Sequence, residues 1–217
     1  MSSPGEHGIA KIMLEAEVAT FRPDQPFRYT SGILSPIYLD NRVLISYPEH
    51  RKAISIALEE LARKTFPKID VLAGTATAGI PWTAWVAQKM NLPMVYVRDK
   101  AKRHGQKNQV EGVLPPNSRT LVVEDLISTG QSALGTVQAI RRAGSEPLGV
   151  VAIYSYGMAS AAKGFRESGV PLATLTDFEV LTEEAEQCGQ LTKESKKRVL
   201  EWAKDPAGWG KKMGFES

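Results

Sequence analysis

Two carboxylates stand next to each other at the end of an apolar run, and a string of polar and hydroxyl residues follows them. Glu124 and Asp125 come directly after residues 120–123, and the next residues are Leu126, Ile127, Ser128, Thr129, Gly130, Gln131 and Ser132. A turn that leads into a helix start would offer main-chain N–H groups and hydroxyls, which together bind a phosphate monoester. Carboxylates repel phosphate, so we expect the pair to face sugar hydroxyls, directly or through a metal ion. A phosphate site beside a diol site fits a ribose 5-phosphate.

A helix N-terminus is the structural alternative for the same residues. Ser or Thr would cap the helix, and the acids would lie near the positive end of its dipole. The position of the whole string after an apolar strand favours the ligand site. The chain contains neither the Gly-x-x-x-x-Gly-Lys pattern of a Walker A loop nor a Gly-x-Gly-x-x-Gly fingerprint, so this phosphate site is of another kind.

A second candidate segment follows the apolar run 69–73 and consists of small residues, Gly74, Thr75, Ala76, Thr77 and Ala78. Small residues let main-chain N–H groups approach a ligand closely. The same composition is typical of a tight strand-to-helix turn, and from these residues alone both interpretations stand equal.

Positive charge is concentrated in residues 98–109, after the apolar run 93–97. The residues there that could contact an anion are Arg98, Lys100, Lys102 and His104. Such a run is often only a solvated surface. Because it follows a strand and contains Gly105, we interpret it as a lid that places cations over a polyanion and excludes water.

Strand-length apolar runs alternate with helical patterns along the chain. The expected strands are 69–73, 93–97, 120–123, 148–154 and 172–175. Helices are expected over 51–65, from about residue 81, and through residues 137 and 140 to a point near 144. This alternation predicts an α/β fold with a mostly parallel central sheet and helices on both faces. Ligands bind at the carboxyl ends of such strands, where all three candidate segments stand.

The composition is that of a globular protein. Of the 217 residues, 42% are hydrophobic and 24% are charged, and the net charge of +3 is too small to indicate nucleic-acid binding. The single cysteine, Cys188, excludes an intramolecular disulfide and a zinc site of several cysteines. The sequence shows no signal-peptide pattern and no apolar run of about 20 residues, the length of a membrane helix. We therefore expect a cytoplasmic protein without nucleic-acid or membrane partners.

The string from Val122 to Ser132 resembles the signature with which type I phosphoribosyltransferases bind phosphoribosyl pyrophosphate (PRPP). Other segments resemble the orotate phosphoribosyltransferase branch of that superfamily. They are residues 27–42, residues 96–98, the pattern Lys102-x-His104-Gly105, and residues 110–112. The likeness extends from about residue 20 to about residue 180.

This resemblance implies the type I phosphoribosyltransferase fold with a small N-terminal hood, and transfer of ribose 5-phosphate from PRPP to orotate. It implies catalytic roles for Lys102, His104 and Asp125. It implies substrate contacts from Arg98, Lys100, Lys102, His104, Glu124, Asp125 and residues 126–132. The residues expected to contact pyrophosphate are Gly74, Thr75, Ala76 and Thr77. Those expected to contact orotate are Thr30, Ser31 and Gly32. Mg²⁺ would be bound through PRPP and waters, without dedicated metal ligands. Family members are usually homodimers whose lid reaches the neighbouring subunit's site.

The resemblance also implies one phosphoribosyltransferase domain over 1–217. About 1–45 would bind the base, about 50–180 would bind PRPP, and about 181–217 would form a C-terminal helical tail. In that tail, residues 191–217 indicate a basic helix plus a tail with Trp202 and Trp209, and the sequence indicates no function for it.

Three positions depart from the family pattern. Asp99 and Thr30 stand where many members have lysine, and the strand ending at Tyr156 lacks an arginine that several members use to hold orotate. Either main-chain amides near Ser31 and Gly32 hold the orotate carboxylate, or the chain prefers another base. A non-catalytic PRPP sensor is the alternative from a different class, but it would need a DNA-reading module.

Overall fold

The computed structural model describes residues 4–29, 32–99 and 109–215. Its centre is a six-stranded sheet. Across the sheet the strands are β10 (Leu172–Asp177), β9 (Glu146–Ser155), β8 (Arg119–Ile127), β5 (Val71–Thr75), β6 (Met94–Val97) and β7 (Val110–Glu111). All neighbours are parallel except β7, which is antiparallel to β6. The mostly parallel sheet expected from the sequence is therefore confirmed.

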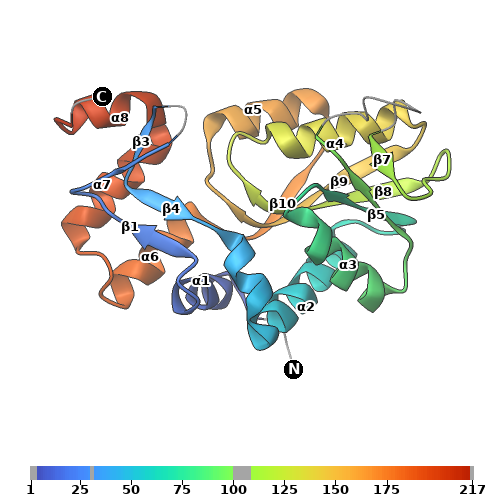
Figure 1. Cartoon of the computed structure of the whole chain (residues 1–217), viewed down its shortest axis with the longest axis horizontal. Helices are drawn as coiled ribbons and strands as arrows, with labels where there is room; N and C mark the ends of the chain where they lie inside the picture. Colours follow the sequence, from blue (N-terminus) through green and yellow to red (C-terminus); the bar gives the residue numbers. More distant parts are fainter. Residues whose placement is uncertain (1–3, 30–31, 100–108, 216–217) are drawn as a thin grey trace.

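Helices cover both faces of this sheet. They are α2 (Pro48–Thr65) and α3 (Gly79–Met90) on one face, and α4 (Gln131–Arg142) and α5 (Ala159–Ser168) on the other. Figure 1 shows α4 and α5 above the sheet and α2 and α3 below it. Along β8, Leu121 and Val123 join the core beneath, whereas Val122 joins the core above. This alternation is the period of a strand buried on both sides.

Helix α2 shows how local sequence sets the elements. Ile54 and Leu58 are fully buried on its inner face, as their spacing predicts. The helix begins at Pro48, three residues before the expected start at residue 51, because proline fits the first helical turn.

The other elements form a second lobe, which we call the hood. Its N-terminal part contains α1 (Glu6–Glu15), β1 (Ala19–Phe21), β2 (Phe27–Arg28), β3 (Leu34–Ser35), β4 (Ile37–Leu39) and the 3₁₀ helix η1 (Asn41–Ser46). Its C-terminal part contains α6 (Phe178–Gln187), α7 (Lys193–Lys204) and α8 (Pro206–Lys212). Strands β1 and β4 are antiparallel, and so are β2 and β3.

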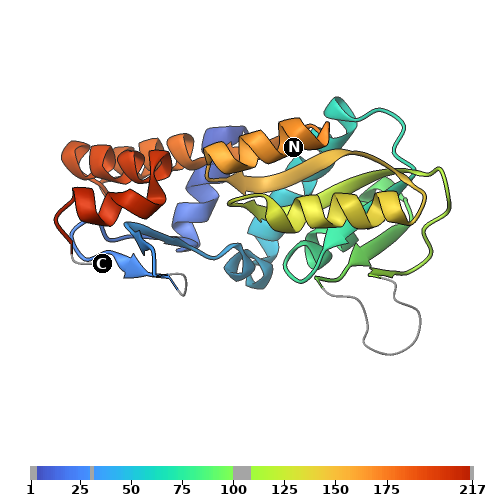
Figure 2. The ribbon, with the colours of Figure 1, turned by 90° about the horizontal axis from the view of Figure 1, so that it is seen from above.

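The two ends of the chain build this lobe together. Figures 1 and 2 show the blue N-terminal and red C-terminal segments at the same end of the molecule. The indole of Trp202 on α7 donates to Leu34 O at 2.9 Å, and its ring lies against Tyr156 and Phe178 with centroids 5.5 and 6.0 Å away. The C-terminal segment is therefore no separate tail but the support of the N-terminal strands. The expectation that Trp209 lies in a tail is wrong, because Trp209 is buried within α8.

Among the described residues, the helices are too short or too polar for any of them to traverse a lipid bilayer.

We expect Trp202→Phe to destabilise the protein by roughly 1–3 kcal/mol, because the buried Leu34 carbonyl loses its donor. Urea unfolding followed by fluorescence would measure the loss. Trp85→Phe is the matched control, since Trp85 lies half-buried on α3 and packs edge-on against Trp82. Equal losses for both variants would contradict the importance of the indole donor.

Candidate active site

The acidic pair lies inside strand β8, not after it. The strand was expected to end at Val123, but its pairing with β9 continues to Ile127, opposite Ser155. The difference arises because β9 is long enough to supply partners for the polar residues. Glu124 and Asp125 are thereby fixed by the sheet, at the carboxyl end of a central strand.

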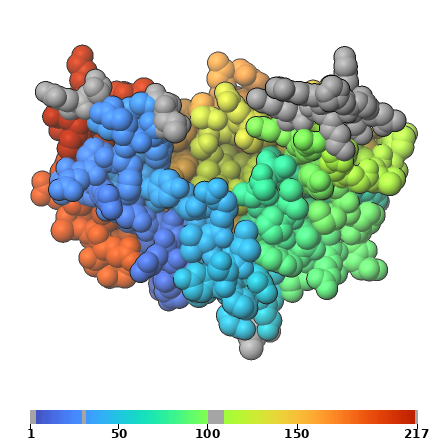
Figure 3. All heavy atoms as spheres, in the orientation of Figure 1, coloured from blue at the N-terminus to red at the C-terminus, as the bar shows by residue number. Residues whose placement is uncertain are grey.

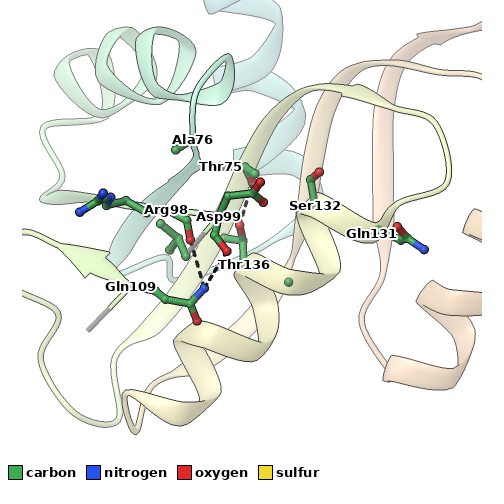
Figure 4. Close-up of a pocket in the computed structure, with 10 residues that line it drawn as sticks. Thr75, Ala76, Arg98, Asp99, Gln109, Gln131, Ser132 and Thr136 are labelled. Carbon is green, nitrogen blue, oxygen red and sulfur yellow. Dashed lines mark hydrogen bonds between the residues drawn. The ribbon is translucent and has the colours of Figure 1, made fainter. Parts of the chain in front are cut away.

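Glu124 is only 5% exposed and is held by neighbours from two other elements. Its Oε1 accepts a hydrogen bond from Asp125 N at 3.0 Å, and its side chain also bonds to the Thr75 hydroxyl of β5. The Thr136 hydroxyl of α4 donates in turn to Thr75 Oγ1 at 3.1 Å, as Figure 4 shows. A chain of hydroxyls thus connects α4 to the buried carboxyl group.

The hood reaches Asp125 through Asn41 at the start of η1. Asn41 is 1% exposed, and its Nδ2 donates to Asp125 O at 2.6 Å. Arg42 follows, and its guanidinium forms an ion pair with Asp40 at 2.7 Å. Arg42 is also near enough to Asp125 to affect its titration. The hood and the acidic pair are therefore joined by the contact of the buried Asn41 side chain.

Burial disfavours charge on both carboxyl groups. Burial raises the pKa of Glu124 well above its ordinary value, and the charge of Asp125 raises it further. Burial also raises the pKa of Asp125, although hydrogen bonds from Glu124 and main-chain N–H groups oppose this shift. Of the two groups, Glu124 is the one whose charge is disfavoured more strongly. A ligand that brings positive charge or hydroxyls would counteract this effect.

The hydroxyl-rich turn leads directly into α4. Gly130 is the N-cap, with a φ of 80°, and it has no side chain to cap the helix. A Cβ at this position would also lie 3.0 Å from Phe165. The simple cap by Ser or Thr is therefore wrong, since Ser128 and Thr129 precede the N-cap. The first N–H groups of α4 are left for an anion.

The small-residue segment divides between strand and turn. Gly74 and Thr75 belong to β5, so the turn begins only at Ala76. A Cβ on Gly74 would lie 2.7 Å from Thr83 Oγ1, which explains the glycine by close packing of α3. The peptide bond between Ala76 and Thr77 is cis.

The ends of β5 and β6 and the start of α4 enclose a cavity of about 290 Å³, which we call the α4 cleft. It is lined by Thr75, Ala76, Val97, Arg98, Asp99, Gln109, Gln131, Ser132, Gly135 and Thr136 (Figure 4). Figure 3 shows the surface hollowed between the blue hood and the green sheet lobe, whereas the residues that line the α4 cleft belong to the sheet lobe. The described parts of the three candidate segments thus meet at this cleft. Glu124 is tied to this cleft through Thr75.

Other predicted residues lie elsewhere. Gly32 lies in the β2–β3 turn of the hood with a φ of 85°, and its N–H donates to Tyr29 O at 2.8 Å. The side chain of Ile127 belongs to the core, and its carbonyl accepts from Tyr156 N, whereas Leu126 is half-buried. The predictions for Thr30, Ser31, Lys100, Lys102 and His104 lie outside the described residues.

Thr136 and Gln109 are site residues that sequence analysis did not select. Thr136 lies four residues after Ser132, so helical spacing alone would have placed both on one face of α4. Gln109 has no comparable signal, because its position depends on the pairing of β7 with β6.

We expect Glu124→Gln to be more stable than wild type at neutral pH. A raised pKa in the folded state means that wild type loses stability as the pH rises above about 4.5, the ordinary value of the carboxyl group. The neutral amide avoids this loss while it can keep the contacts with Thr75 and Asp125 N. Thermal unfolding at pH 4.5 and pH 8 would show a difference that grows with pH. Glu59→Gln on α2 is the control. If the difference in melting temperature between Glu124→Gln and wild type were the same at both pH values, the raised pKa of Glu124 would be contradicted.

Comparison with known proteins agrees with this geometry. Residues 48–173 match the family model described as the phosphoribosyl transferase domain. An orotate phosphoribosyltransferase from Listeria monocytogenes is 46% identical over 206 residues, covering 95% of this chain and 99% of the relative. One from Coxiella burnetii is 47% identical over 201 residues, covering 93% of this chain and 96% of the relative.

Solved structures show the same fold. The orotate phosphoribosyltransferase of Aeropyrum pernix has a TM-score of 0.73 and 26% identity, covering 84% of this chain and 99% of that one. A Mycobacterium tuberculosis orotate phosphoribosyltransferase, solved in complex with PRPP, has a TM-score of 0.64 and 22% identity, covering 82% of this chain and 99% of that one. The identity and coverage of the relatives decide the matter: this chain belongs to the orotate phosphoribosyltransferase family.

Proposed function

We propose that this protein transfers ribose 5-phosphate from PRPP to orotate, forming orotidine 5'-phosphate and pyrophosphate in pyrimidine biosynthesis. The observation that carries the proposal is the pair of buried Glu124 and half-buried Asp125, in which Glu124 is bonded through Thr75 to the cleft at the start of α4. A diol bound at the carboxyl groups would thus adjoin a phosphate bound at the start of α4. Family membership supplies the choice of PRPP and orotate.

Different groups of the protein would bind different parts of PRPP. Residues 128–132 and the first N–H groups of α4 would bind the 5-phosphate, because they are main-chain donors at the positive end of a helix. Glu124 and Asp125 would accept hydrogen bonds from the ribose hydroxyls, with Asp125 as the catalytic carboxylate. Ala76 and Thr77 would contact pyrophosphate from the turn after β5.

Negative charge grows on pyrophosphate as its bond to ribose breaks. Cations at that place stabilise the transition state more than the ground state. Arg98 lines the α4 cleft and suits this role. By resemblance we add Lys100, Lys102 and His104, which lie outside the described residues. Orotate is already an anion, so no strong general base is required.

Mg²⁺ fits the chemistry of this site. The ion prefers oxygen ligands, and Glu124 and Asp125 offer carboxylate oxygens at the strand end. Among the described residues no three His, Cys, Asp or Glu side chains form a metal cluster, so substrate oxygens and waters would complete the coordination. When bound, the ion would neutralise charge on pyrophosphate.

The remaining parts of the proposal follow the family. The N-terminal part of the hood, including Thr30, Ser31 and Gly32, would bind orotate, and residues of about 50–180 would bind PRPP. Ser128 would also reach the base. We further propose a cytoplasmic homodimer whose cationic segment enters the partner's site.

The decisive experiment is incubation with PRPP, Mg²⁺ and a panel of bases. We expect orotate to be consumed and the double variant Glu124→Gln with Asp125→Asn to be inactive although folded, because the ribose loses its anionic partners. A thermal melt of the double variant controls for folding. Consumption of a different base would reject orotate as the substrate, and double-variant activity within about tenfold of wild type would reject the acidic pair.

Lys102→Ala should lower kcat far more than it weakens PRPP binding. A cation that meets the growing charge of a closed site contributes about 10²–10³ in rate, whereas an exposed lysine contributes almost nothing. Single-turnover rates and calorimetric PRPP affinities would separate the two effects. If each site takes Lys102 from one subunit and Asp125 from the other, mixing the Lys102→Ala and Asp125→Asn proteins should restore some activity. One of the two sites in a mixed dimer then contains both wild-type residues. An unchanged kcat would remove Lys102 from the mechanism.

A further inference from the structure

The α4 cleft has one wall formed by two chain segments that pair with each other. Strands β6 and β7 are antiparallel, with Val97 opposite Val110. Just beyond this pair, Arg98 N donates to Gln109 O at 2.9 Å. Arg98 and Gln109 therefore lie opposite each other, and both line the cleft.

The side chain of Gln109 continues this pairing. Its Nε2 donates to Arg98 O at 3.1 Å and to Asp99 O at 3.2 Å, and Figure 4 shows both contacts converging on the amide. Peptide units are planar, so holding two successive carbonyl groups fixes the orientation of both units. Together with the bond from Arg98 N to Gln109 O, the contact with Arg98 O holds both peptide units that flank the Arg98 Cα, and hence the direction in which its side chain leaves the main chain.

Gln109 is itself held from helix α4. Arg142 Nη2 donates to Gln109 Oε1 at 2.6 Å. A charged donor forms a stronger bond than a neutral one, and it polarises the amide so that the Nε2 hydrogens become better donors. Arg142 lies in the last turn of α4, whose first turns supply Gln131 and Ser132 to the cleft. One helix therefore contacts the cleft directly and also orients its opposite wall.

The side-chain contact of Arg98 cannot replace this support. Its Nη1 donates to Glu111 Oε1 at 3.4 Å, and the Arg98 side chain is 40% exposed. A long contact at an exposed position restrains a guanidinium weakly. The position of the Arg98 side chain therefore depends on the main chain that Gln109 holds.

We propose that Gln109, backed by Arg142, is a positioning residue for PRPP: it holds the main chain of Arg98 and Asp99, which line the α4 cleft, in place for pyrophosphate. The proposal rests on the proposed function. Gln109 acts through Arg98 and does not touch the reacting atoms. Since a half-exposed hydrogen bond adds little to stability, its loss affects PRPP kinetics and leaves folding nearly unchanged.

Two variants separate the two halves of the amide. Gln109→Met keeps the length and removes every side-chain hydrogen bond, whereas Gln109→Glu keeps an acceptor for Arg142 and removes the side-chain donors to the main chain. We expect kcat/KM for PRPP to fall about tenfold in both, the effect of losing one or two ordinary hydrogen bonds. The KM for orotate should stay within about twofold, and the melting temperature should stay near that of wild type.

Arg142→Met tests the support of the amide. It should produce a smaller fall of the same kind and add nothing to Gln109→Met, because the shared contact is already absent. The matched control is Arg141→Met. Arg141 is the adjacent exposed arginine of α4, donates to Ser168 O at 2.9 Å, and should leave the kinetics unchanged.

Unchanged PRPP kinetics in Gln109→Met would overturn the proposal. Equal decreases in kcat/KM for PRPP and for orotate, together with a lower melting temperature, would also overturn it, since these results indicate a merely structural residue. Wild type in the same assay separates a failure of the proposed function from a failure of the positioning role of Gln109. A wild type that fails to consume orotate rejects the proposed function, whereas an active wild type with an equally active Gln109→Met rejects only the positioning role.

Discussion

The position of two adjacent carboxyl groups, one buried and one half-buried, at the end of a central strand is the constraint on which this structure depends. An unpaired buried charge is costly, so each group needs hydrogen-bond partners or a proton. The Thr75 hydroxyl bonds to Glu124, and Asn41 holds the main chain of Asp125. These partners come from β5 and from the hood, while Thr136 of α4 bonds to Thr75. Sheet, hood and α4 are therefore joined at the acidic pair.

A parallel sheet is well suited to this arrangement. The carboxyl ends of its strands lie at one edge, so the turns after β5 and β8 and the end of β6 meet although they are distant in sequence. Helix α4 begins at this edge with free N–H groups and ends with Arg142 bonded to Gln109. The same architecture thus places the first N–H groups of α4, the acidic pair and Arg98 at one edge of the sheet.

The sequence predicted the fold because its signals are local. Alternation of strand and helix patterns requires only neighbouring residues, and buried positions such as Ile54 and Leu58 follow from helical spacing. The failures concern long-range contacts. The strand end at Ile127 depends on the length of β9, and strand β7 exists only as a partner of β6. The contact of Trp202 with Leu34 joins residues 168 positions apart, so no local pattern reveals that the C-terminal helices support the hood.

The departure at Tyr156 has a structural reason. Tyr156 is 6% exposed, lies between Trp202 and Phe178, and bonds to the hydroxyl of Tyr29, which donates to Ile37 O at 2.8 Å. Burial raises the pKa of Tyr156 well above its ordinary value, so the phenol stays neutral. An arginine there would bury its charge among aromatic rings, which is costly without a partner. The position therefore connects β9 to the hood instead of contacting an anion. Because the Gly32 N–H is engaged by Tyr29 O, a base carboxylate would have to displace that bond or bind other groups of the hood.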